Sequence, residues 1–213
     1  MLPIDPFNRT VLAIFFVLWA VSCVKLPYPE FFAMQHVPTI VGVVGLILAE
    51  RKQWMDRLGF SLVVAFLILH LIGARYLYSN VPYDDWSQLV FGVRINDVMG
   101  FERNHYDRLV HFCFGLLFVY PLRQFFQKEL KLTGWWAGVL SICVVLAASA
   151  VYEIAEWATA MTFAPDWAEA YNGQQGDVWD PQRDMALAAI GSIVAAGFLG
   201  LRRRQSALNT GAD

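Results

Sequence analysis

Charged residues are scarce in this chain: only 16% of its 213 residues are Asp, Glu, Lys or Arg, whereas 57% are hydrophobic. A typical soluble domain is about 25% charged. The basic residues form no large cluster and the net charge is -2, so the chain lacks the electrostatic footprint of a nucleic-acid-binding protein. This composition, with a mean hydropathy of +0.45, predicts an integral membrane protein.

Cysteine is also rare. The three cysteines, Cys23, Cys113 and Cys143, lie inside apolar runs and show no CxxC spacing. This pattern argues against a disulfide framework and against a thiolate metal site, and it is typical of small core residues.

The N-terminus lacks the strongly basic region of a cleaved targeting signal. Only Arg9 precedes the first apolar run, and Asp5 offsets its charge. We therefore expect the first apolar run to remain as an uncleaved helix.

Six apolar stretches approach the roughly 20 residues that a helix needs to cross a bilayer. They are 10–26, 31–49, 58–77, 109–126, a segment within 132–163, and 185–201. The second is the weakest, because Gln35, His36 and Pro38 interrupt it. The last two are rich in Gly, Ala and Ser, so we expect their helices to pack tightly on each other or on neighbours. The predicted fold is an all-α polytopic membrane helix bundle of about six transmembrane helices, with residues 1–213 forming a single integral membrane domain.

The distribution of Lys and Arg predicts the orientation. Ten of them lie on the side of the two termini, and six are spread over longer segments on the other side. By the positive-inside rule, the N and C termini are cytoplasmic. Segments 78–108 and 164–184 then form outer loops, 202–213 forms a cytoplasmic tail, and thirteen of the eighteen carboxylates lie on the outer side.

Polar residues gather at four helix ends that this orientation places on the outer surface. The motifs are HLIGARY with His70 and Arg75, NHYDRLVHF with Asp107, Arg108 and His111, YEIAEW with Glu153 and Glu156, and GQQGDVWDPQRDM with Asp177, Asp180, Arg183 and Asp184. Within each motif, residues three or four apart share a helical face. The pattern therefore predicts an outward-facing His, carboxylate and Arg site.

Each motif also has a simpler interpretation. Asp107 and the acids around Pro181 suit helix N-termini, where carboxylates are favoured, and His70 suits a satisfied histidine inside the bundle. Glu153 and Glu156 are harder to explain, because they follow an apolar stretch and an intramembrane carboxylate costs roughly 2.5 kcal/mol or more without a partner. The coincidence of all four motifs at one surface favours a functional site.

Taken in this order, the four motifs resemble those of the YjdF-type family of uncharacterised bacterial inner-membrane proteins, over roughly residues 8–200. The resemblance implies a multi-pass protein of the bacterial inner (plasma) membrane, with the site facing the periplasm or cell exterior. A remoter likeness to VanZ-like membrane proteins involves Asp107, Arg108 and His111, then Glu153 or Glu156, then Asp177 or Asp184 with Gly191. That likeness implies a role in the cell envelope, although the acidic turn here is longer than in the VanZ pattern.

Carboxylate and imidazole ligands suit a divalent metal ion such as Mg, Mn, Fe or Zn. We expect His70, His111, Glu153 and Asp184 to be the metal ligands. The catalytic candidates are Asp107, Glu153, Glu156, Asp177 and Asp184, and the candidates for binding an anionic substrate are Arg75, Arg108 and Arg183. A metal-dependent hydrolase or transferase acting on a lipid-linked or envelope substrate would follow.

Two alternatives come from other functional classes. The carboxylates could carry protons or cations in a small ion or solute transporter, although no relay of charges is visible in the inner half of the spans. They could also pair with the arginines in a structural envelope protein without catalysis. The sequence leaves the substrate, the ion and the oligomeric state open, and the lipid bilayer is the one partner that the composition implies.

Overall fold

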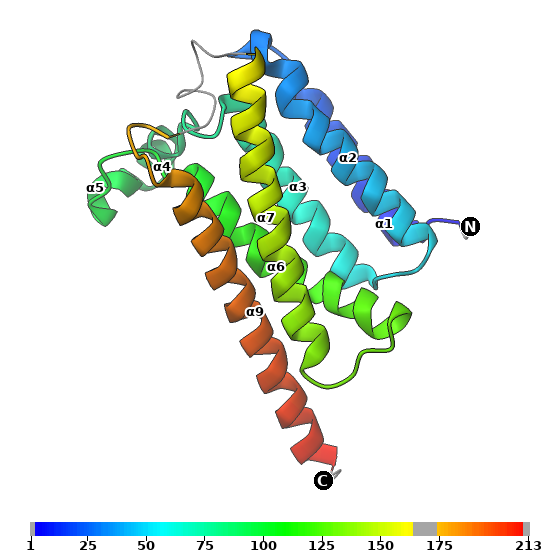
Figure 1. Cartoon of the computed structure of the whole chain (residues 1–213). Helices are drawn as coiled ribbons and strands as arrows, with labels where there is room; N and C mark the ends of the chain where they lie inside the picture. Colours follow the sequence, from blue (N-terminus) through cyan, green and yellow to red (C-terminus); the bar gives the residue numbers. More distant parts are fainter. Residues whose placement is uncertain (1–2, 164–173, 211–213) are drawn as a thin grey trace.

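The computed structural model describes residues 3–163 and 174–210, with backbone alone for 163 and 202–210. Every regular element in these ranges is helical. The helices are α1 (Pro6–Ser22), the short 3-10 helix η1 (Pro29–Phe31), α2 (Phe32–Arg51), α3 (Arg57–Tyr76), α4 (Tyr83–Phe91), α5 (Ile95–Met99), α6 (Tyr106–Glu129), α7 (Trp136–Phe163) and α9 (Asp180–Thr210). Figure 1 shows that the long helices run up and down between two ends of the bundle. The predicted all-α polytopic class is confirmed.

Within the described part of the chain, five helices are long and apolar enough to cross a membrane: α2 with η1, α3, α6, α7 and the Asp180–Leu201 part of α9. The predicted second span is continuous, and Pro38 lies inside α2 without ending it. Membrane helices tolerate such prolines because neighbouring groups satisfy the freed carbonyl. The first predicted span is a shorter apolar helix, because α1 begins at Pro6 and ends at Ser22, four residues before the expected end.

Local chemistry sets several helix ends. Asp5 caps α1 by accepting a hydrogen bond from the Phe7 amide at 2.9 Å, and Asp56 caps α3 by accepting one from the Gly59 amide at 2.8 Å. Side-chain oxygens at these positions satisfy amides that have no partner in the first helical turn. The chain leaves α3 through Leu77 in the left-handed conformation, which turns Tyr78 back toward the bundle.

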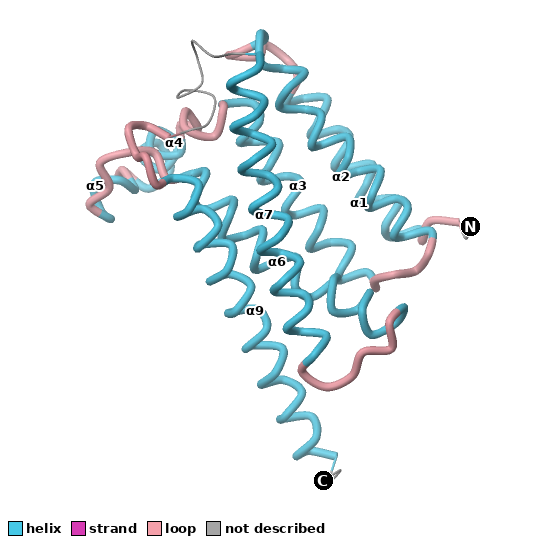
Figure 2. Tube along the Cα trace, in the orientation of Figure 1, coloured by secondary structure: helices cyan, strands magenta, loops and turns pink. Residues whose placement is uncertain are grey.

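The bundle is built from two groups of helices that meet where α3 packs on α6. In the first group, α1, α2 and α3 enclose an apolar core that includes Phe15, Leu46 and Phe60. In the second, α6, α7 and α9 enclose a smaller core that includes Val119, Val145 and Ala188. Figure 2 shows the two groups side by side, with loops confined to the ends of the long helices.

The closest approach in the bundle is between α6 and α9. A Cβ atom on Gly115 would lie 2.0 Å from the Ala188 carbonyl oxygen, and one on Gly191 would lie 2.1 Å from that of Phe112. The two glycines therefore allow the helix backbones to touch, as small residues do in membrane helix pairs. The expected packing of the last two spans on neighbours is observed, and the tightest contact is the one with α6.

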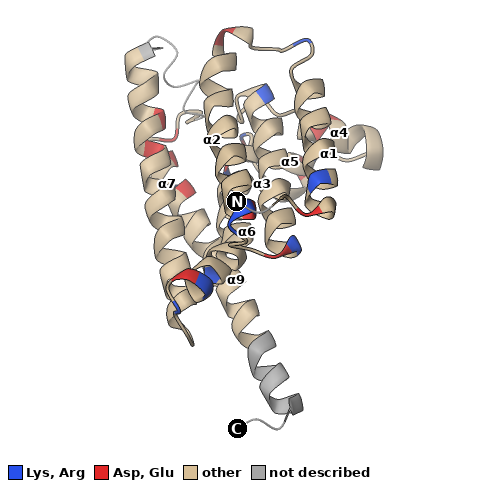
Figure 3. Ribbon diagram, turned by 90° about the vertical axis from the view of Figure 1, so that its right-hand side faces the viewer, with Lys and Arg blue, Asp and Glu red and all other residues tan. Residues whose placement is uncertain are grey.

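One end of the bundle carries α4 and α5, and we refer to it as the α4–α5 end (Figure 1). The segment between α3 and α6, predicted as an outer loop, holds these two short helices. The second predicted outer loop is described only from residue 174 onward, so its first part lies outside the described residues. Figure 3 shows that the acidic positions inside α7 fall in the half nearer the α4–α5 end, while most of each long helix carries no charge.

Candidate metal centre

Three helices bring four buried acid and imidazole side chains together near the α4–α5 end. Asp107 and His111 lie one turn apart on α6, Glu153 lies on α7, and Asp184 lies on α9. Each of the four residues is at most 9% exposed. We call these residues the carboxylate–histidine cluster. Three of the four predicted motifs contribute to it.

The distances within the cluster suit the binding of one metal ion by several of its side chains. His111 Nε2 lies 3.2 Å from Glu153 Oε1 and 3.7 Å from Asp107 Oδ1. One ligand atom each from Asp107, His111 and Asp184 lies within 4.8 Å of the others. Two ligands of one divalent ion, each about 2.0–2.6 Å from it, lie at most about 5 Å apart. The three side chains are therefore close enough to bind one ion after small adjustments.

Two oxygens of the cluster have no hydrogen-bond donor among the residues that the structure describes. They are Glu153 Oε1 and Asp184 Oδ1, and both are buried. Glu153 Oε1 is within ion-pair distance of His111 Nε2, but the angles do not make a hydrogen bond. Buried polar atoms normally find a partner, and an exception calls for an explanation such as an ion. The donor set of two or three carboxylates and one imidazole suits Mg, Mn, Fe or Zn.

A network of ion pairs lies directly beside the cluster. Arg103, which precedes α6, donates to both oxygens of Asp180 at 2.8 and 3.1 Å. Arg108 on α6 donates to Asp177 at 2.7 Å and to Asp180 at 3.0 Å. Arg183 pairs with Asp177 at 2.8 Å. This network joins the beginning of α9 to the beginning of α6, and it thereby holds Asp184 near His111.

The ion-pair network also shifts the pKa values of Asp177, which belongs to it, and of His105, which lies beside it. Desolvation raises the pKa of Asp177, but the Trp179 amide and the guanidinium groups of Arg183, Arg108 and Arg103 outweigh it and hold the pKa below its ordinary value. Desolvation, together with the positive charges of Arg108 and Arg103, lowers the pKa of His105. Asp177 thus stays ionised, and His105 favours its neutral form.

His70 lies outside the cluster. Its Nε2 is 2.8 Å from Thr39 Oγ1 and its Nδ1 is 2.5 Å from the Tyr78 hydroxyl. Both ring nitrogens are therefore engaged, although His70 lines the same cavity as Asp107 and His111. Its assignment as a metal ligand stays a prediction.

The three predicted anion-binding arginines lie in different places. Arg75 donates to the carbonyls of Ser22, Val24 and Lys25, so its guanidinium group satisfies backbone carbonyls at and just beyond the C-terminal end of α1. Arg108 is mostly buried in the ion-pair network, whereas the Arg183 side chain is 55% exposed. Of the three, Arg183 is the most accessible to a ligand.

The two remaining catalytic candidates, Glu156 and Asp177, lie outside the carboxylate–histidine cluster. Glu156 lies one turn beyond Glu153 on α7 and is half-buried, and Asp177 is engaged by three arginines. Sequence reasoning did not single out Arg103 and Gly115. Gly115 follows His111 by four residues on α6, so helical spacing could have singled it out, whereas Arg103 lies before α6 begins and no such spacing marks it.

Comparisons with known proteins agree with the resemblance seen in the motifs. A family model described as "Predicted membrane protein (DUF2238)" matches residues 7–205. The chain is 32% identical over 167 residues to the Inner membrane protein YjdF of Escherichia coli (strain K12), covering 78% of this chain and 76% of that protein. No solved structure matches the chain significantly. The predicted resemblance to YjdF-type proteins is confirmed.

Proposed function

The chain belongs to this family of predicted membrane proteins, and from that premise we propose that it is a membrane-embedded, divalent-metal-dependent hydrolase or transferase. Asp107, His111 and Asp184 hold the ion. The observation that carries the proposal is the convergence of their ligand atoms within 4.8 Å in a buried position. The similarity to an inner-membrane protein and the several apolar helices support a multi-pass location in the inner membrane.

Glu153 completes the site as a fourth ligand or as a base. Catalytic metal sites keep a coordination position open for water or substrate, and three protein ligands leave such a position. Glu153 Oε1 lies 3.2 Å from His111 Nε2 and has no hydrogen-bond donor among the described residues. It is therefore placed to accept a proton from a water molecule beside the ion.

The chemistry that follows is the displacement of a leaving group from a phosphoryl or carbonyl centre. A bound divalent ion would polarise that centre and lower the pKa of a bound water. In hydrolysis, the water oxygen forms a bond to phosphorus or carbon while its proton passes to Glu153. The bond to the leaving oxygen breaks, and that oxygen takes the proton. In transfer, an acceptor hydroxyl takes the place of water with the same balance.

The site faces the outside of the inner membrane in this proposal. The long helices alternate in direction, so the ends of α1 and α9 nearest the termini lie on the side of the bundle opposite α4 and α5 (Figure 1). Ten of the sixteen Lys and Arg lie on the terminal side. The positive-inside rule then directs the α4–α5 end and the carboxylate–histidine cluster toward the periplasm.

Metal analysis tests the proposal. The wild type, His111→Ala, Asp184→Asn and the control His36→Gln would be purified in detergent, and their bound metals measured by mass spectrometry. His36 is a buried histidine outside the cluster, bonded to the Phe32 carbonyl. We expect about one ion per chain in the wild type and in His36→Gln, and loss of the ion in the two cluster variants.

Size-exclusion profiles and helical circular dichroism would establish that the variants are folded. A wild type with no more metal than folded His111→Ala would refute the metal site and leave the transporter and structural alternatives. Uptake in proteoliposomes that rises above background would favour the transporter.

A further inference from the structure

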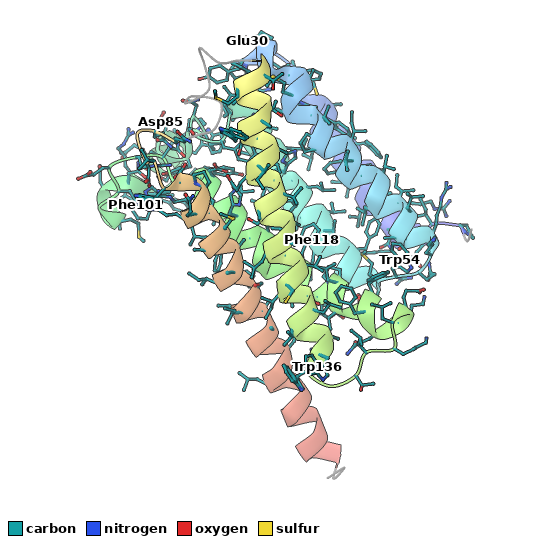
Figure 4. All side chains as sticks on the ribbon, in the orientation of Figure 1. Glu30, Trp54, Asp85, Phe101, Phe118 and Trp136 are labelled. Atoms are coloured by element: carbon teal, nitrogen blue, oxygen red, sulfur yellow. The ribbon has the colours of Figure 1, made fainter. Side chains whose placement is uncertain are left out.

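An elongated cavity of about 530 Å³ leads away from the carboxylate–histidine cluster between α2, α3, α6 and α7. Its lining on α6 extends from Asp107 to Phe125, which at 1.5 Å per residue is about 27 Å along the helix. Figure 4 places Phe118, one of its lining residues, midway between the two ends of the bundle that Glu30 and Trp136 mark. The cavity therefore follows α6 for most of its length.

The cavity is long relative to its width. Its volume of about 530 Å³ is spread over about 27 Å of helix, and the carbon atoms of a guest lie about 3.5–4.0 Å from the wall atoms that they contact. An extended hydrocarbon chain lying along α6 therefore fits its shape.

Its two ends differ in polarity. The end near α4 and α5 presents His70, Tyr78, Asp107 and His111, and the rest is lined mainly by apolar side chains that include Leu46 and Phe118. A ligand that fits both ends carries a polar head and one long apolar tail.

The walls of the cavity also provide a route from the bilayer. α2 packs on α3, and α7 packs on α6 and α9. Phe31 of η1 and Ala160 of α7 belong to one buried apolar cluster with Leu77, at the end of the bundle. Farther along, both helices expose large apolar residues, with Val44 on α2 at 51% and Val151 on α7 at 66%. These exposed apolar faces of α2 and α7 are where a lipid tail would enter the cavity.

We propose that the cavity binds the hydrocarbon tail of a long-chain, single-tailed lipid phosphate of the isoprenyl type, which enters between α2 and α7 and places its phosphate at the cluster. Length favours such a tail, because about 27 Å is close to the whole hydrocarbon thickness of roughly 30 Å and exceeds the half that an ordinary acyl chain occupies. Phosphate oxygens are hard ligands for a divalent ion held by carboxylates. The role of the phosphate rests on the proposed function, whereas binding of the tail does not.

Gly45 offers a way to block the cavity without disturbing the helices. It lines the cavity, and a Cβ atom there would meet no atom within 4 Å. Gly197 on α9 has the same open surroundings but lies away from the cavity, on an exposed face. Gly45→Phe therefore fills the tail site, and Gly197→Phe is its matched control.

The experiment is photolabelling in phosphatidylcholine vesicles with a photoactivatable isoprenyl monophosphate. A two-chain phosphatidic acid with the same photogroup is the comparison probe. We expect the isoprenyl probe to label peptides of α2, α3 and α6 in the wild type and in Gly197→Phe, with about a tenfold loss in Gly45→Phe, equivalent to about 1.4 kcal/mol.

Equal labelling in the wild type and Gly45→Phe would overturn the proposal, as would labelling spread evenly over all lipid-facing helices. Stronger cavity labelling by the phosphatidic acid probe would also overturn it, by identifying an ordinary two-chain lipid as the occupant. His111→Ala keeps the two proposals separate, because it should lose the metal but retain labelling of the apolar part of the cavity. Labelling without metal in the wild type would refute the metal site alone.

Discussion

A single methyl group at Gly115 should push α9 away from α6 and open the carboxylate–histidine cluster. The Cβ of an alanine there would lie 2.0 Å from the Ala188 carbonyl oxygen, whereas real Cβ contacts essentially never fall below 3.0 Å. The obstacle is backbone, so no side-chain rotation relieves it. The helices must separate locally by about 1 Å.

The cluster is close to this contact on both helices. His111 precedes Gly115 by one turn on α6, and Asp184 precedes Gly191 by two turns on α9. Metal sites tolerate errors of only about 0.2 Å in ligand distance, so a separation of about 1 Å should impair binding of an ion. Overpacking also costs about 1–3 kcal/mol, and each kcal/mol lowers the Tm by about 2–4 °C in a protein of this size.

The assay combines thermal unfolding in detergent with metal analysis for Gly115→Ala, Gly191→Ala, the double variant and Gly197→Ala. Both single variants should lose stability and metal. The double variant should lose less stability than the sum, because the first methyl group already displaces α9. Gly197→Ala should match the wild type, since a Cβ there has no neighbour within 4 Å. A folded Gly115→Ala that keeps wild-type Tm and metal content would refute this account of the packing.

Three further predictions concern the α4–α5 end and the orientation of the chain. Asp180→Asn should cost about 1–3 kcal/mol, because it removes one of the two carboxylates that the mostly buried guanidinium groups of Arg103 and Arg108 share, while Asp177 remains. Asp85→Asn at an exposed pair should change the Tm little, and equal Tm values for the two variants would contradict the role of the network. Because the pKa of His105 is lowered in the folded state, the unfolded chain takes up its proton first as the pH falls through about 6.5, and folding loses stability there. The Tm of the wild type should therefore fall more than that of His105→Gln between pH 7.5 and 5, whereas parallel curves would exclude this contribution. In a cysteine-free background, Asp85→Cys should react with a membrane-impermeant maleimide added to spheroplasts and Gln53→Cys should not, and the reverse pattern would invert the proposed orientation.

Much of the fold could be predicted from the chain alone, because the bilayer imposes a simple requirement. A span must be about 20 apolar residues long and must satisfy its own backbone groups, so runs of apolar residues identify the helices without knowledge of their contacts. The predicted helix boundaries were less accurate where residues at the helix start, rather than hydropathy, determine where the helix begins. Asp5 and Pro6 start α1 earlier than the apolar run suggests, and α9 starts at Asp180, before the apolar run begins.

The candidate site was only partly predictable. Helical spacing places Asp107 and His111 on one face, and the absence of an obvious partner for Glu153 inside an apolar run indicates a paired or functional role. The spacing of residues along one helix does not show which other helix their shared face packs against. For that reason the sequence grouped His70 with the expected metal ligands and left Asp107 out, whereas the structure gathers Asp107 with His111 and Asp184. The sequence did distinguish Asp184, an expected ligand, from Asp177, which binds three arginines.

Only the tertiary structure assigned these roles. Composition and periodicity depend on neighbours within a few residues, and they establish the helices, their polar faces and the end of the bundle where those faces gather. The distance between two side chains on different helices depends on how closely the backbones approach. Here that distance depends on Gly115 and Gly191, where the absence of a Cβ atom lets α6 and α9 touch and brings Asp184 to His111.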